Sequence, residues 1–374
     1  MPTMTSNVKS LSKALPESVR RHNRAVLLHL LYPDLALTRA DLARASGLTR
    51  VAVSDIVADL VAQGLLQERG PSASAGPGKR GQLLAINPSS RSIVTLDLSA
   101  PYIFRGAVMN LLGQVTARRE IPLGTAHTQE AQLELVGQLC EELMAAAQAP
   151  ILGVGVASPG IVNAEGVVDD TANFGWTHVD FRRFLSNRAG LEPALISVEN
   201  DANSEVLAEQ QYGSGGSNLL LVHMAQGLGA GLLVGGELVR GRNRAAGEIG
   251  QVKVESGGQR RLESCISVPL LAAQMEKEPG RAQAILTQAG RLLGSALSMP
   301  VGLLDLSQVA ILGQAQVVNQ TFISAVEEAL NEAVSADFRR RVMVLRSSLG
   351  EDAALLGACA TVVRTQLYSG EIRE

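Results

Sequence analysis

The sequence predicts an α/β chain of two unlike parts, a basic helical head and an acidic body in which strands and helices alternate. The first observation is charge: residues 1–91 carry 12 Lys/Arg against 6 Asp/Glu, whereas the remainder carries 21 against 30. The second is the hydrophobic period, which changes from helical to two after Ile93. The third is length, because 374 residues exceed one ordinary core and predict two or three domains.

Composition excludes several classes of protein. Hydrophobic residues make up 46% of a globular chain, and three scattered cysteines without CxxC spacing fit a reducing cytoplasm rather than a disulfide framework. The N-terminus lacks the apolar region of a signal peptide. The most apolar stretch, residues 219–236, contains His223, Gln226 and several glycines, which is typical of buried strands. We therefore expect no membrane partner, and the basic head alone indicates a polyanion partner.

Three helices are predicted in the head. Residues 18–32 form an amphipathic helix that Pro33 ends. Two short helices follow, with Thr38 and Thr49 as their caps and Gly47 at the tight turn between them. The predicted inward positions of the last helix are Val53, Ile56, Val57 and Leu60. This spacing favours a helix-turn-helix, with an ordinary αα-hairpin as the alternative.

A β-hairpin follows the three helices. It begins at Leu65-Leu66, has a tip rich in Gly, Ser and Pro over residues 71–81, and returns over residues 83–86. Three helices and a basic-tipped hairpin predict a winged helix-turn-helix DNA-binding domain, with its wing and linker, over residues 1–88. The helix from Thr49 is expected in the major groove, with Arg50 donating two hydrogen bonds to a guanine.

The wing supplies further candidate contacts. Lys79 and Arg80, flanked by glycines, are expected in a minor groove or on phosphates, with solvated loop charges as the alternative. Ser54 is expected to reach a base or a phosphate. The candidate DNA-binding residues are Arg39, Thr49, Arg50, Ser54, Lys79 and Arg80.

The body, residues 89–374, reads as a β-meander followed by αβ units, a pattern that occurs twice. Strands are predicted over residues 93–98, 102–109 and 115–122, followed by a helix over 129–147. The repetition predicts two similar lobes with a cleft between them. Lobe one covers about 92–199 plus the C-terminal helix, and lobe two about 200–356.

One polar segment, Glu199-Asn200-Asp201-Ala202-Asn203, lies between the apolar run 194–198 and a predicted helix over 204–211. An acid flanked by amides where a strand leads into a helix is typical of ligand positions in α/β folds. Asp201 has three candidate roles: a base that deprotonates a sugar hydroxyl, a group that binds one, or a helix cap.

Together these features resemble the ROK family (repressor, open reading frame, kinase). Its repressor branch joins a winged helix-turn-helix to a two-lobed, actin-like or ribonuclease H-like sugar-kinase fold. The segments that carry the resemblance are Ser158-Pro159-Gly160, residues 173–176, residues 199–203, the glycine run 227–231, residues 246–250 and Leu262-Glu263. The sugar-binding residues that the resemblance implies are Asn173, Asn200, Asp201, Glu248, Gln251 and Glu263. For Glu248, a surface acid after a glycine turn is the alternative.

The chain departs from the family pattern in two places. The turn after Asp97, where a kinase needs glycine around ATP phosphates, reads Leu98-Ser99-Ala100-Pro101-Tyr102, and Ala225-Gln226 replaces the usual Gly-Thr. We therefore expect no ATP binding and no catalytic residue. Gln251 also replaces the histidine of the family's structural zinc site, and residues 252–262 contain no cysteine. We expect neither zinc nor another cofactor.

These expectations combine into a function. We expect a cytoplasmic transcriptional regulator, a repressor of sugar-utilisation genes, that binds operator DNA as a homodimer or higher homo-oligomer and responds to a sugar or sugar derivative. The alternatives are an ATP-dependent sugar kinase carrying a DNA-binding head and a regulator that answers to a partner protein.

Overall fold

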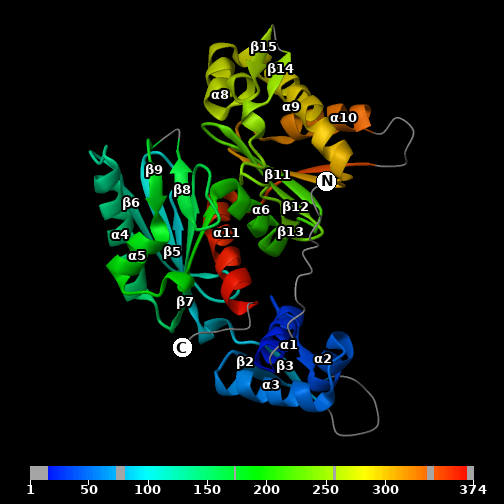
Figure 1. Ribbon diagram of the computed structural model, residues 1–374. Coiled ribbons are helices and arrows are strands. Elements are labelled where there is room, and N and C mark those ends of the chain that lie inside the picture. The colour runs from blue at the N-terminus through cyan, green and yellow to red at the C-terminus, as the bar shows by residue number, and fades with distance from the viewer. Residues whose placement is uncertain (1–15, 73–80, 172–173, 256–257, 335–340, 369–374) are drawn as a thin grey trace, which may run out of the picture. The chain divides into compact units, whose positions relative to one another are not determined.

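The protein is described here by a computed structural model that covers residues 16–72, 81–171, 174–255, 258–334 and 341–368 (Figure 1). The chain divides into two compact units. The head unit comprises Met1–Ser90 together with Arg364–Glu374, and the body unit comprises Arg91–Val363. The described residues from Arg364 onward therefore belong to the head unit.

The head unit has the predicted winged helix-turn-helix. Its elements in chain order are α1 (Pro16–Leu31), β1 (Leu37–Thr38), α2 (Arg39–Ser46), α3 (Arg50–Ala62), β2 (Leu66–Pro71) and β3 (Gln82–Ile86), with the strands in the order β1-β3-β2. Thr38 caps α2 in a capping box with Asp41, and Thr49 caps α3 by accepting a hydrogen bond from Ala52 N. Gly47 ends α2 with φ 71°, a conformation that favours glycine. The four predicted inward residues of α3 are all buried.

The C-terminal segment completes the head unit. Tyr368 packs edge-on against His29 and Tyr32, with ring centroids 4.8 Å and 5.9 Å away. The chain reaches this position directly from α11 (Ala353–Val362) through a single π-helical stretch, Val363–Leu367. One helix of the body therefore runs covalently into the head.

The body unit contains two five-stranded sheets of matching topology (Figure 1). The first, in the order β10-β7-β4-β5-β6, consists of β4 (Ser92–Asp97), β5 (Ile103–Met109), β6 (Val115–Pro122), β7 (Ile151–Ser158) and β10 (Ile196–Asn200). The second, in the order β13-β12-β11-β16-β17, consists of β11 (Leu219–Met224), β12 (Leu228–Val234), β13 (Glu237–Leu238), β16 (Gln308–Gly313) and β17 (Met343–Arg346). Each is an antiparallel meander extended by two parallel strands, so the predicted repetition is confirmed.

Helices cover the sheets. The first sheet packs against α4 (Gln129–Ala146) and α5 (Phe181–Ala189). The second packs on one face against α8 (Val268–Lys277), α9 (Ala282–Leu304) and α10 (Gln320–Val334), and on the other against α6 (Asp201–Tyr212) and α11. Four further strands form two small hairpins. The first hairpin consists of β8 (Val167–Asp170) and β9 (Thr177–Asp180), and the second of β14 (Lys253–Glu255) and β15 (Gln259–Arg261). The short helix α7 (Glu263–Ile266) follows the second hairpin. The sequence did not predict these hairpins or α5.

Two central helices, α6 and α11, pack at very short range. A Cβ atom on Gly357 would lie 2.1 Å from the carbonyl oxygen of Ser204, and one on Gly155 would lie 2.4 Å from that of Ala358. Only glycine allows these approaches, so α11 is held closely against both α6 and β7. Of the helices in the described ranges, none has the length and apolar character needed to cross a bilayer.

The glycine contact leads to a first prediction. Gly357→Ala should lower the midpoint of thermal unfolding and cost about 1–3 kcal/mol, because the added methyl group overpacks the α6–α11 contact. Elsewhere in a helix the same change is stabilising by up to about 1 kcal/mol, so the sign is diagnostic. Gly280→Ala is the control, since a Cβ there meets no atom within 4 Å. A Gly357→Ala midpoint equal to or above the wild-type value would contradict the assignment.

Candidate functional site

The candidate ligand site lies where parallel strands of the first sheet end. Asp97 is the last residue of β4, Ser158 of β7 and Asn200 of β10. Asp97 is paired in register with Ala157, and Asn200 with Ser158, so the three strands end at the same edge. The polar segment after β10 is therefore placed where open α/β sheets bind ligands.

Asn200 is the cap of α6, and it also positions its neighbours. Its Oδ1 accepts a hydrogen bond from Asn203 N at 3.1 Å, while its Nδ2 donates to Gly160 O at 3.0 Å and to Asp201 Oδ1 at 2.9 Å. Because Asn200 supplies the cap, α6 begins at Asp201, three residues before the predicted start.

Asp201 is the half-buried first residue of α6, and its Oδ1 also accepts from Ala202 N at 2.9 Å. Among the described residues, its Oδ2 has no hydrogen-bond partner. Burial raises the pKa of Asp201 to about 6, and the negative charges of Glu205 and Asp97 act in the same direction. The two hydrogen bonds to this carboxylate therefore both use Oδ1.

A buried ion pair lies beside Asp201. Glu205, one turn along α6, is buried, and its Oε2 lies 3.0 Å from Nδ1 of His223 on β11. Burial opposes the charge on His223, but the carboxylates of Glu205, Asp201 and Asp97 raise its pKa to about 9. Sequence reasoning did not identify this pair. The available signals were the four-residue spacing from Asp201 and a histidine inside an apolar strand.

Asp97 is buried, and it bonds within its own turn. Its Oδ1 accepts hydrogen bonds from Ser99 N at 3.0 Å and from Ser99 Oγ at 2.6 Å. Burial raises the pKa of Asp97, although these hydrogen bonds oppose the increase. Tyr102, at the end of the turn, is exposed.

The loop that carries Glu248 is pressed against β12 by glycine. Gly247 has φ 97°, a Cβ there would lie 1.8 Å from Ala230 O, and its own carbonyl accepts from Ala230 N at 2.9 Å. Glu248 is exposed, yet partial burial raises its pKa, and the charges of Asp201 and Glu263 raise it further. These three carboxylates therefore lie within electrostatic reach of one another.

Gln251 and Glu263 are joined directly, since Gln251 Nε2 donates to Glu263 Oε1 at 2.9 Å. The structure thus brings five of the predicted sugar-site residues into one region: Asn200, Asp201, Glu248, Gln251 and Glu263. The sixth, Asn173, lies outside the described residues. Within the described ranges, no group of three or more His, Cys, Asp or Glu side chains is arranged to hold a metal ion.

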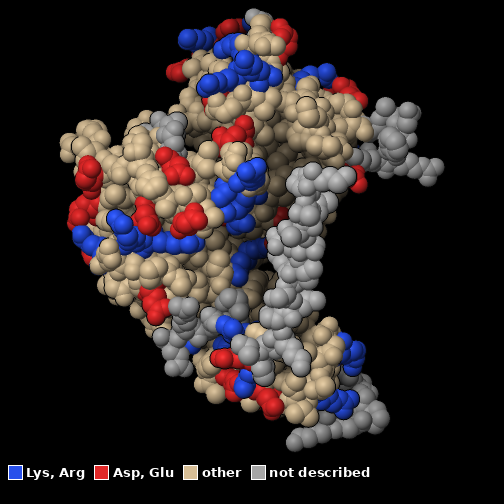
Figure 2. All heavy atoms as spheres, in the orientation of Figure 1, with Lys and Arg blue, Asp and Glu red and all other residues tan. Residues whose placement is uncertain are grey.

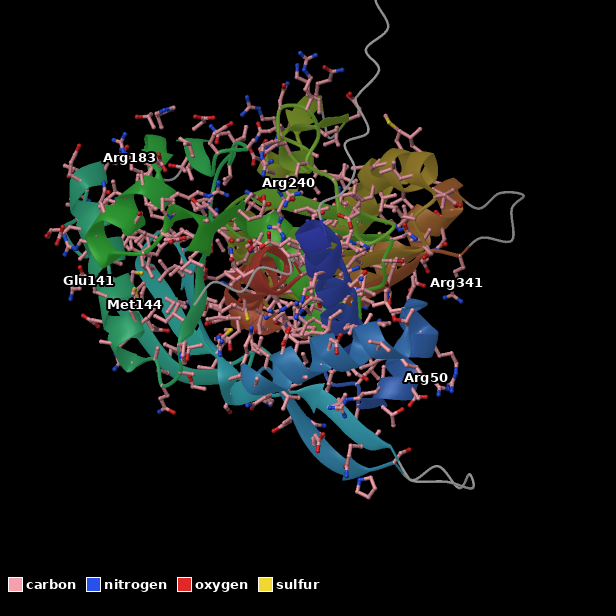
Figure 3. The ribbon with its side chains drawn as sticks, turned by 60° about the horizontal axis from the view of Figure 1, so that its bottom comes forward. Arg50, Glu141, Met144, Arg183, Arg240 and Arg341 are labelled. Carbon is pink, nitrogen blue, oxygen red and sulfur yellow. The ribbon has the colours of Figure 1, made fainter. Side chains whose placement is uncertain are left out.

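A second polar cluster joins the loop after β13 to the first sheet. Glu199 is buried, and its Oε2 accepts from Arg240 Nε at 2.8 Å and pairs with Arg240 Nη2 at 2.6 Å. Arg244 Nε donates to Val162 O at 2.6 Å. Figure 3 labels Arg240 in this region, and Figure 2 shows basic and acidic side chains interspersed on the visible face of the body. These contacts hold the loop after β13 against Glu199, the residue that precedes Asn200.

On the head unit, Arg50 begins α3 and is exposed, as is Ser54 one turn later (Figure 3). Thr49 is exposed, and its hydroxyl caps α3 at 3.2 Å from Ala52 N. Arg39, which the sequence predicts to contact DNA, forms an ion pair within the head unit, because its guanidinium lies 3.6 Å from the carboxylate of Glu68 on β2. Lys79 and Arg80 lie outside the described residues.

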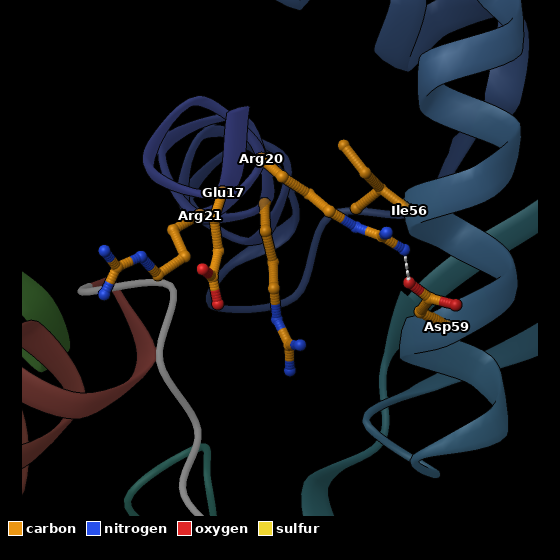
Figure 4. Close-up of a pocket in the computed structure, with 6 residues that line it drawn as sticks. Glu17, Arg20, Arg21, Ile56 and Asp59 are labelled. Atoms are coloured by element: carbon orange, nitrogen blue, oxygen red, sulfur yellow. Dashed lines mark hydrogen bonds and ion pairs between the residues drawn. The ribbon is translucent and has the colours of Figure 1, made fainter. Parts of the chain in front are cut away.

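Two side-chain contacts join the C-terminal half of α3 to α1. Arg20 pairs with Asp59, and Arg24 donates to Gln63. Figure 4 shows the hollow beside this contact, and the residues that line it are Glu17, Arg20, Arg21, Arg24, Ile56 and Asp59. These contacts orient α3 while its opposite face stays exposed.

The fold is that of a winged helix-turn-helix joined to a two-lobed domain of the sugar-kinase type. Residues 96–267 match the sequence profile of the ROK family. A putative xylose repressor from Caldicellulosiruptor sp. (strain Rt8B.4) is 31% identical over 243 residues, which are 63% of this chain and 60% of that protein. The chain thus matches about 60% of the length of that relative.

Two comparisons extend over nearly the whole chain. The DNA-binding transcriptional dual regulator NagC of Escherichia coli (strain K12) is 23% identical over 394 residues, covering 93% of this chain and 94% of that protein. The crystal structure of a ROK family transcriptional regulator, a homolog of the E. coli MLC protein, has a TM-score of 0.80 at 20% identity. It covers 94% of this chain and 98% of the other, and confirms the predicted fold class.

The raised pKa of Asp201 gives a second prediction. Between about pH 4 and pH 6 the folded state binds more protons at Asp201 than the unfolded state, so stability falls as pH rises through this window. Asp201→Asn removes that cost and keeps an acceptor for Ala202 N. Its thermal midpoint at pH 7.5 should exceed the wild-type midpoint, and the difference should shrink towards pH 4. Glu332→Gln, at an exposed site on α10, should show no such trend. A constant difference at all pH values would rule out this titration.

Proposed function

We propose that the protein is a transcriptional repressor that binds operator DNA through the head unit and is controlled by a sugar bound at the candidate site. The observation that carries the proposal is the arrangement of α3. Thr49 caps this helix, and four buried side chains anchor it to the head unit. Arg50 and Ser54 are exposed on its outer side. An exposed, anchored second helix is the part of a helix-turn-helix that enters the major groove. The near full-length likeness to NagC supports the same function.

The proposed effector is a sugar or sugar derivative. The vicinal hydroxyls of a sugar both donate and accept hydrogen bonds, and carboxylate and amide side chains in a binding pocket supply the matching acceptors and donors. In this proposal Asp201 Oδ2 accepts a hydrogen bond from a sugar hydroxyl. Support comes from Glu248, Gln251 and Glu263, which lie in the same region. Asn200 orients Asp201, and Asn173 keeps its proposed role from the sequence. The similarity to a putative xylose repressor from Caldicellulosiruptor sp. (strain Rt8B.4) supports a pentose as the effector.

We propose that the domain is not a kinase. A kinase of this fold needs glycine amides around the phosphates beyond Asp97, whereas this turn has Pro101, which has no N–H, and Ser99 occupies a carboxylate oxygen of Asp97. We also propose that no zinc is required, because the Gln251–Glu263 hydrogen bond orders the loop directly. An ATP-coupled assay with a panel of sugars distinguishes this proposal from the alternative of a kinase with a DNA-binding head.

Signal transmission is proposed to run through α11. Helix α6 carries the site at its first turn and contacts α11 at Gly357, and the chain continues from α11 to Tyr368 in the head unit. A sugar changes DNA binding only if it binds two states with different affinity. We propose a cytoplasmic homodimer, because two heads that read spaced half-sites multiply the specificity of one.

A third prediction tests DNA binding. The full-length protein should shift a duplex from its own upstream region in a mobility assay, and affinity should fall steeply with salt. Arg50→Ala should weaken specific binding about 5- to 150-fold, the range for one bidentate base contact. Arg183→Ala, an exposed arginine of the body, is the control. Absence of a shift at low salt would exclude the proposal.

A fourth prediction tests the effector site. One member of a panel of monosaccharides, amino sugars and sugar phosphates should raise the thermal midpoint of the wild type. Asp201→Asn should abolish or strongly reduce that rise, whereas Glu332→Gln should retain it. The same panel with ATP should give no turnover. Sugar-dependent ATP turnover that Asp201→Asn abolishes would instead establish the kinase.

A further inference from the structure

One apolar side chain in the head is exposed where an apolar residue is unexpected. Val51, the second residue of α3, is 71% exposed. Its helix already has a complete buried face in Val53, Ile56, Val57 and Leu60. Val51 therefore contributes nothing to the core, and its side chain is available to a partner.

Helix geometry places Val51 on the middle of the outer face. Successive residues of an α-helix are about 100° apart, so Val51 points nearly opposite to the buried Val53 and Leu60. Asp55 and Ala58, one and two turns further along, share this face and are exposed. The short side chain of Ala58 leaves room for close approach, and the Thr49 cap holds the first turn in place.

The position distinguishes Val51 from other exposed apolar residues of the head. Leu35 is 56% exposed on the loop after α1, Val19 is 45% exposed on α1, and Val61 is 37% exposed at the far end of α3. Only Val51 occupies the first turn of α3, the part of a recognition helix that contacts base edges.

The chemistry of the major groove indicates what Val51 contacts. Base edges there present hydrogen-bond donors and acceptors, and the single apolar group is the C5-methyl of thymine. We propose that Val51 reads a thymine methyl group in the major groove, beside the base contacted by Arg50. This assignment rests on the proposed DNA-binding function and adds a defined base to it.

The test removes the methyl group from the DNA. The full-length protein first selects its binding sequence from a random duplex pool, and each thymine of that sequence is then replaced singly by uracil. Wild-type affinity should fall about fourfold at one thymine in each half-site, the factor expected for one methyl-sized apolar group. Val51→Ala should bind the thymine duplex more weakly and be indifferent to uracil at that position. Val61→Ala, the matched control on the same helix, should keep the wild-type profile.

The outcomes separate the assignment from the function it rests on. Selection of a bound sequence, with no uracil effect at any thymine, overturns the role of Val51 and leaves DNA binding intact. A uracil effect that persists unchanged in Val51→Ala also overturns it, because another residue then contacts the methyl group. Failure to select any sequence overturns the proposed DNA binding together with this assignment. Since the uracil series uses wild-type protein, it does not depend on whether a variant folds.

Discussion

The burial of carboxylates around the first turn of α6 is the constraint on which the body depends. Asp97, Asp201 and Glu205 come from two different elements and lie within electrostatic reach of one another. Packing like charges away from water is costly unless a cation or a proton compensates. His223 supplies the cation for Glu205, and Ser99 supplies hydrogen bonds for Asp97. Asp201 Oδ1 accepts hydrogen bonds from Asn200 and Ala202, and the other oxygen of this carboxylate is the one we propose as a ligand contact.

This arrangement couples the two sheets. His223 stands on the second sheet, Asp97 on the first, and α6 carries the acids between them. The glycine contacts of α11 with α6 and with β7 place a second helix against the same region. Helix α6 therefore packs against α11, and α11 is continuous with the segment whose Tyr368 packs against α1. This continuity of the chain is the observation on which the proposed signal path rests.

Local patterns predicted the fold well where neighbours in sequence decide the structure. The caps at Thr38 and Thr49, the left-handed Gly47 and the inward stripe of α3 all follow from residues a few positions apart. The two meanders were found in the same way. The β8–β9 and β14–β15 hairpins were missed because such short strands depend on the surface beneath them. Helix α5 was also missed, although Phe181, Phe184 and Leu185 follow helical spacing.

The sequence by itself determined the class of the protein: its period, charge division and turn residues predict a winged helix-turn-helix joined to a two-lobed domain, and its motifs identify the acids. Only the tertiary structure decided how those acids divide their roles. Glu205 paired with His223, Gln251 bonded to Glu263, and Glu248 came within electrostatic reach of Asp201 and Glu263. These partners lie 12 or more residues apart or on different elements, and a pKa depends on burial and on through-space charge, which linear spacing does not contain.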